Sequence, residues 1–136
     1  MGFIASSDHG STHRSYACLY AKENTREGLM EAMLARRTYA ATDRIICEFF
    51  IGDAMMGEEI KSQGPLNVLI RFLGTNGIKE VTLLRDSIPF RIWSPSGKET
   101  EITMTLYDHE ACKHYFYVRM IQYDSNLAWS SPIWID

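Results

Sequence analysis

From residue 44 onward, apolar and polar side chains alternate along the chain with a period of two. Alternation of this kind is typical of strands that bury one face and expose the other. Residues that favour turns, chiefly Gly, Pro, Asn, Asp and Ser, separate the alternating segments. The pattern predicts strands at 45–51, 68–73, 80–85, 89–93, 102–107, 116–121 and 132–135. Several short strands joined by such turns indicate an antiparallel β-sandwich over residues 44–136.

The first 43 residues follow a different pattern. Short apolar runs at 2–5 and 16–21 predict two short strands. The segment 25–37 predicts a helix, because its apolar residues recur on one helical face, namely Leu29, Met30, Met33 and Leu34.

The ends of this helix carry capping signals. Asn24 is the expected N-cap, and the carboxylate of Glu27 falls where it reaches back to the Asn24 amide. Arg36 and Arg37 would then lie in the last turn, where positive charge suits the helix dipole.

Together these elements predict an α+β fold that is mainly β. A short β-loop-β-α piece at 1–43 precedes the sandwich at 44–136, and the composition changes near Thr42 and Asp43. The first piece is too small to bury a core of its own. The apolar face of its helix therefore needs a partner: the sandwich, a second copy, or protein outside this chain.

Composition excludes several classes of function. Hydrophobic residues make up 46% of the chain and charged residues 23%, which is typical of a folded globular protein. The net charge of −3 gives no basic face for a nucleic-acid partner. No apolar run approaches the ~20 residues of a membrane span, so no membrane partner is expected. Three widely spaced cysteines, Cys18, Cys47 and Cys112, are expected to be reduced thiols.

The segment richest in candidate functional side chains lies near the N-terminus. Asp8, His9 and His13 fall within six positions, directly after the apolar run at 2–5. Carboxylate and imidazole groups are ligands for divalent metals, so these three residues are the candidate metal ligands. Arg14 beside them is a candidate contact for a substrate anion. In the alternative reading, Asp8 stabilises a Ser- and Gly-rich turn and both histidines are loop residues.

Three segments carry a resemblance to a known family. The first, at 2–9, reads GFIASSDH; the second, at 20–42, contains YAKENTRE and ARRTYAAT; the third, at 117–134, contains YVRMIQ and AWSSPIW. They resemble the C-terminal third of bacterial metallohydrolases of the PHP superfamily (polymerase and histidinol phosphatase), including branches known only as domains of unknown function.

This resemblance implies a fragment of a β/α barrel with a two- or three-metal site. Asp8 matches the aspartate of a late Asp-x-His motif. The family spacing would place the histidine at position 10, which is glycine here, so the second ligand would be His9 or His13. The early His-x-His motif of the family has no counterpart in this chain.

The resemblance leads to two expectations of different class. In the first, the chain is the C-terminal portion of a metal-dependent hydrolase that uses zinc, manganese or iron, and it is inactive alone. Its partner would be the missing N-terminal barrel portion, or a second copy through self-association. In the second, it is a non-catalytic sandwich module used for packing, oligomerisation or ligand binding.

Overall fold

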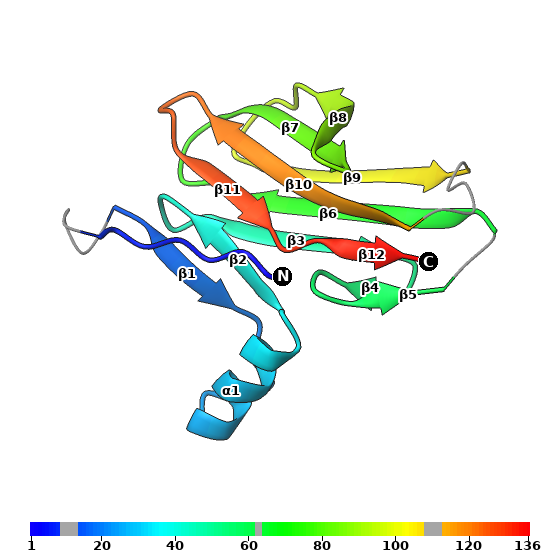
Figure 1. Ribbon diagram of the computed structural model, residues 1–136. Coiled ribbons are helices and arrows are strands. Elements are labelled where there is room, and N and C mark those ends of the chain that lie inside the picture. Colours follow the sequence, from blue (N-terminus) through cyan, green and yellow to red (C-terminus); the bar gives the residue numbers. More distant parts are fainter. Residues whose placement is uncertain (9–13, 62–63, 108–112) are drawn as a thin grey trace.

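The alternating segments form two sheets that pack face to face, in a computed structural model that describes residues 1–8, 14–61, 64–107 and 113–136 (Figure 1). Within this part of the chain the larger sheet contains β1 (Tyr16–Leu19), β2 (Thr38–Ala41), β5 (Glu59–Ile60), β7 (Ile78–Arg85), β8 (Ile88–Trp93), β10 (His114–Gln122), β11 (Leu127–Ser130) and β12 (Ile133–Ile135). The smaller sheet contains β3 (Ile46–Ile51), β4 (Ala54–Met55), β6 (Leu66–Leu73) and β9 (Glu99–Leu106). Strands account for 52% of the described residues and helix for 7%, so the predicted α+β, mainly β class is confirmed.

Strand β10 organises the larger sheet. It pairs with β7 along one edge, and β8 follows β7. Along its other edge, β12 pairs with the first half of β10 and β11 with the second half. The sheet continues from β11 to β2 and β1, and from β12 to β5. The β12–β5 pairing is parallel and the other described pairings in this sheet are antiparallel.

The core lies between the two sheets and confirms the period-two pattern. On β3, β6 and β10, every second side chain is buried, including those of Phe49, Ile70 and Phe116, which are fully enclosed. Two buried or half-buried tyrosines join the early strands to this core. Tyr39 donates a hydrogen bond to the Ile45 carbonyl at 2.9 Å, and Tyr20 donates to the Cys47 carbonyl at 2.9 Å.

The predicted strand at 2–5 is wrong. These residues have no strand pairing, and the segment instead lies against the outer face of the larger sheet. The Phe3 amide donates to the Ser131 hydroxyl at 2.8 Å, and the Phe3 ring meets the Tyr117 ring edge to face at 5.3 Å. Because this segment covers it, β2 is buried along its whole length.

The helix is shorter than predicted. α1 spans Arg26–Leu34, and Thr25 rather than Asn24 is its N-cap: the Thr25 side chain accepts from the Gly28 amide at 3.1 Å. The helix ends because Arg36 adopts a left-handed conformation with φ of 59°. The amides of Arg36 and Arg37 then donate to the carbonyls of Met33 and Ala32, which closes the end in a Schellman arrangement.

The side chain of Arg36 explains this early ending. Its Nε donates to the Gly57 carbonyl at 2.8 Å, its Nη2 reaches Glu59 at 3.2 Å, and its guanidinium lies 5.1 Å from the centre of the Trp134 ring. These contacts attach the end of α1 to β5 and β12, which a longer helix would prevent.

Four described strands lie outside the predicted set: β2, β4, β5 and β11. The predicted boundary between residues 43 and 44 falls between β2 and β3, which belong to different sheets. Across that boundary, β2 pairs with β11 and so shares one sheet with the C-terminal strands. The division into 1–43 and 44–136 stays a prediction.

Candidate functional site

Two serines, one on each side of the candidate metal segment, are in contact with each other. The Ser15 amide donates to the Ser7 hydroxyl at 3.0 Å, and the two hydroxyls lie 3.2 Å apart. Because this contact brings Ser7 and Ser15 together, the backbones of Asp8 and Arg14 start from neighbouring positions. Phe3 attaches the segment that leads to Asp8 to the larger sheet.

Asp8 lies in an exposed turn directly after Ser7. Its φ of 47° is in the left-handed region, which aspartate tolerates better than most residues. Its amide donates to the Ser6 hydroxyl at 3.3 Å. This geometry fits the turn-stabilising role of Asp8.

The other predicted site residues are placed less fully. Arg14, directly before Ser15, is exposed, and His9 and His13 lie outside the described residues. In the part of the chain that the structure describes, no group of three or more His, Cys, Asp or Glu side chains is arranged to hold a metal. The role of Asp8 as a metal ligand therefore stays a prediction.

A shallow pocket of about 380 Å³ lies beside the segment leading to Asp8. Phe3, Ile4 and Ala5 form one wall, and Ala40, Tyr117 and Trp129 of the larger sheet form the other. Its lining is mostly apolar and aromatic, and among these residues only Tyr117 carries an ionisable side chain, so the pocket is suited to packing.

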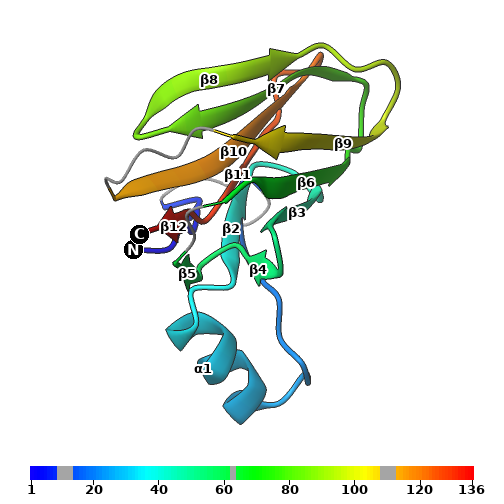
Figure 2. The same ribbon diagram turned by 90° about the vertical axis from the view of Figure 1, so that its right-hand side faces the viewer.

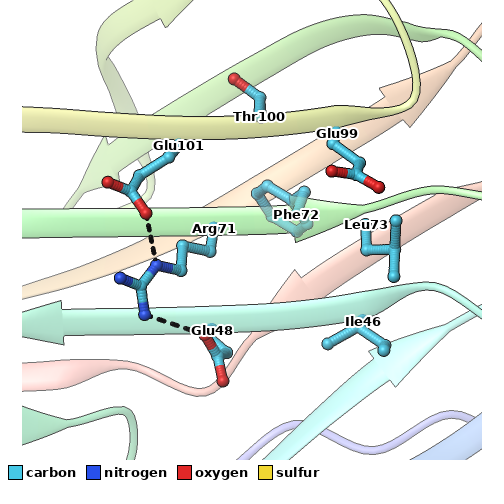
Figure 3. A pocket seen from close by; sticks show the side chains of 8 residues that line it. All are labelled: Ile46, Glu48, Arg71, Phe72, Leu73, Glu99, Thr100 and Glu101. Atoms are coloured by element: carbon cyan, nitrogen blue, oxygen red, sulfur yellow. Dashed lines mark hydrogen bonds and ion pairs between the residues drawn. The ribbon is translucent and has the colours of Figure 1, made fainter.

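A second hollow of about 400 Å³ lies on the outer face of the smaller sheet (Figure 3). Arg71 lies between the cross-strand neighbours Glu101, at 2.7 Å, and Glu48, at 3.6 Å. Two carboxylates thus offset one guanidinium, and the group is solvent-exposed. The arrangement is a cross-strand ion-pair network of the kind that stabilises sheet surfaces, and it leaves no excess positive charge for an anion.

An Asp–His pair was not predicted. His114 at the start of β10 has its Nδ1 2.6 Å from Asp86, and Asp86 also accepts from the Tyr115 amide at 3.1 Å. Because an ionised carboxylate can only accept, His114 donates from Nδ1. Burial alone would raise the pKa of Asp86, but the Tyr115 amide and the His114 ring outweigh it and hold that pKa below its usual value.

His109 and Cys112, which are near His114 in the sequence, lie outside the described residues. The sequence indicated a short connection between the predicted strands at 80–85 and 89–93, but it did not indicate His114 as the partner of Asp86; in the structure the connection is a two-residue turn between β7 and β8. Asp86 and Ser87 both have positive φ there, 51° and 68°, which is the backbone of a tight hairpin turn.

The described cysteines are not activated as nucleophiles. Cys18 and Cys47 are free thiols, as expected. Burial raises the pKa of both, most strongly for the fully enclosed Cys47. Since the thiolate is the reactive form, both are structural residues.

Comparison with known proteins places the chain in a family without assigning a role. A family described as "Protein of unknown function (DUF3604)" matches residues 4–71, half of the chain. An uncharacterized protein of Chlamydia pneumoniae is 35% identical over 130 residues, and uncharacterized proteins of Chlamydia trachomatis and Chlamydia muridarum are 33% and 32% identical.

The chain is much shorter than these relatives. Each alignment covers 82% of this chain and 21% of the relative, so the chain spans about a fifth of their length. No solved structure gives a significant match. Among the described residues, no helix is long and apolar enough to cross a membrane.

Proposed function

The chain belongs to the DUF3604 family, and we propose that it is the C-terminal portion of a metal-dependent hydrolase whose other ligands come from the remainder of a longer protein. The observation that carries this proposal is the exposed Asp8 turn, which directly follows a segment that is attached to the larger sheet. Phe3 contacts that sheet, and Ser7 contacts Ser15 on the other side of the candidate ligands.

Two further observations support the proposal. The relatives are about five times longer than the stretch they share with this chain, which leaves ample protein to supply further ligands. The sequence resembles PHP-type metallohydrolases around the same segment. A three-ligand site with an open position for water is the usual minimum for hydrolysis.

The residues of this chain would have limited but specific roles. Asp8 would bind the metal through its carboxylate, His9 or His13 would be a second ligand, and Arg14 would contact an anionic substrate. A bound zinc, manganese or iron ion would supply an activated water for attack on a phosphoester or a related ester or amide bond. The sandwich would hold this segment against the rest of the enzyme.

A hydrolysis assay tests this proposal. A chimera in which the chain replaces the matching fifth of the C. pneumoniae relative should hydrolyse a generic phosphoester in the presence of Zn²⁺ or Mn²⁺. Asp8→Asn should lower that rate at least about a hundredfold, the typical scale for losing one strong electrostatic contact to a transition state. Asp53→Asn, an exposed aspartate in the β3–β4 turn, is the matched control and should leave the rate unchanged.

The isolated chain should show negligible turnover with the same substrate and metals. Robust hydrolysis by the isolated chain that is lost in Asp8→Asn would refute the proposal that the site is completed elsewhere. Equal rates for the chimera and its Asp8→Asn variant would refute the role of Asp8.

A non-catalytic module is the second candidate. The observation that favours it is the continuous sandwich core, which the described strands build without the candidate metal segment. A module of this kind has no need of the Asp8 turn, so its metal affinity would not depend on Asp8.

A further inference from the structure

The apolar stripe of α1 is exposed to solvent. It consists of Leu29, Met30, Met33 and Leu34, which are 38%, 50%, 53% and 77% exposed. On the opposite side of the helix, Ala32 is fully buried. Figure 2 shows α1 projecting below both sheets, so the sandwich does not cover this stripe.

The helix gains little of its stability from the contacts described. A helix of nine residues is too short to be stable in water by itself, and most helices depend on packing of an apolar face. Here the face available for packing is turned outward. A group of four large exposed apolar side chains on one element is typical of an interface.

The size of the stripe argues against a second copy as its main occupant. A stable complex of separate proteins usually buries about 800 Å² on each partner, which is more than one face of a nine-residue helix offers. A segment connected to the same chain meets a smaller requirement, because it does not lose the free motion of a separate molecule on binding.

The relatives show where such a connected segment would come from. About four fifths of their length lies outside the stretch shared with this chain. We propose that this remaining part of the DUF3604 protein packs on the α1 stripe and so holds the Asp8 turn and the sandwich in place against it. The inference rests on the proposed place of this chain in a longer enzyme, but its tests do not use hydrolysis.

Methionine oxidation followed by mass spectrometry tests the inference directly, because the chain provides its own probes. Met30 and Met33 are half exposed, whereas Met56 and Met120 are fully buried. In the isolated chain, hydrogen peroxide should oxidise the first pair much faster than the second. In the chimera with the C. pneumoniae relative, oxidation of Met30 and Met33 should slow at least tenfold while Met56 and Met120 stay protected.

Paired variants locate the interface. Met33→Asp should remove the protection of Met30 in the chimera, because a charge would be buried in the contact. Ile88→Asp is the matched control: Ile88 is 69% exposed at the start of β8, an element remote from α1 in the fold. It should leave the protection of Met30 and Met33 unchanged.

Rapid oxidation of Met56 and Met120 would reveal a chimera that fails to fold. In that case a two-component experiment replaces the chimera. The remaining four fifths of the relative, added as a separate polypeptide to the isolated chain, should slow the oxidation of Met30 and Met33. Unchanged oxidation in both experiments would overturn the inference. Protection that appears in the isolated chain as its concentration rises would also overturn it, in favour of a second copy.

Discussion

Gly57 is the residue on which the junction between α1 and the sandwich depends. Its φ is 98°, its amide donates to the Pro132 carbonyl at 2.8 Å, and its carbonyl accepts from Arg36. A Cβ at this position would overlap the carbonyl oxygen of Arg36, which is backbone and has little freedom to move. Both the conformation and the close approach therefore require glycine.

We predict that Gly57→Ala lowers the free energy of unfolding by at least about 3 kcal/mol, since it adds a backbone overlap to the strain of a positive φ. Gly97→Ala is the matched control, because Gly97 has a φ of 86° but open space around its Cβ position. It should cost about 1 kcal/mol, from backbone strain alone. Urea denaturation of both variants measures the difference, and equal losses would contradict the close approach at Gly57.

Asp86 provides a pH-dependent contribution to stability. Its pKa in the folded protein is below its usual value, so the ionised carboxylate favours the folded state. The contribution is complete above the ordinary pKa of aspartate, and it is lost as the pH falls through the lower folded-state pKa.

We therefore predict that Asp86→Asn costs about 1 kcal/mol at pH 7, a modest value because the side chain is 35% exposed and partly screened by solvent. The difference from the unsubstituted protein should shrink toward zero when the pH falls well below 4. Denaturation at a series of pH values measures it. A difference that stays constant down to about pH 2 would show that the Asp86 charge is not involved.

At the scale of elements, α1 depends on its caps because little of its surface is buried. Thr25 accepts from the Gly28 amide, and the Thr25 carbonyl accepts from the Leu29 amide at 2.9 Å. We predict that Thr25→Ala lowers the local stability of α1 by about 1 kcal/mol. Hydrogen exchange of the α1 amides should report this, and Asn24→Ala should leave exchange unchanged. Faster exchange in Asn24→Ala than in Thr25→Ala would instead indicate that Asn24 is the N-cap.

The strands that were predicted from sequence are those in which one face is buried and the other exposed. On β3 and β6, cross-strand packing enforces that alternation, as at Phe49 and Ile70. β2 was not predicted because both of its faces are covered, and burial on both faces removes the alternation of apolar and polar residues. The strand predicted at 2–5 is wrong because the segment packs on a sheet without pairing with its strands.

The end of α1 was misplaced because a tertiary contact overrode local preference. The side chain of Arg36 binds the carbonyl of Gly57, twenty-one residues away. Arginine is ordinarily a good helix former, so no local signal indicates that it would adopt a left-handed conformation.

At the scale of the whole molecule, the candidate site stays a prediction. Of its four residues the structure describes Asp8 and Arg14, which adjoin the contacting serines Ser7 and Ser15. The closing contact between Ser7 and Ser15 and the pairing of Asp86 with His114 depend on side chains brought together by folding. The sequence alone does not identify such pairs. The remaining ligands of the proposed metal site would come from protein beyond this chain.

Isothermal titration with Zn²⁺ and Mn²⁺ tests the central claim most directly, that Asp8 is one ligand of a site completed by the rest of the protein. We predict saturable binding by the chimera, an affinity at least about tenfold weaker for Asp8→Asn, equivalent to ~1.4 kcal/mol, and little binding by the isolated chain. Equal affinity of the chimera and its Asp8→Asn variant would contradict the account, as would an isolated chain that binds as tightly as the chimera.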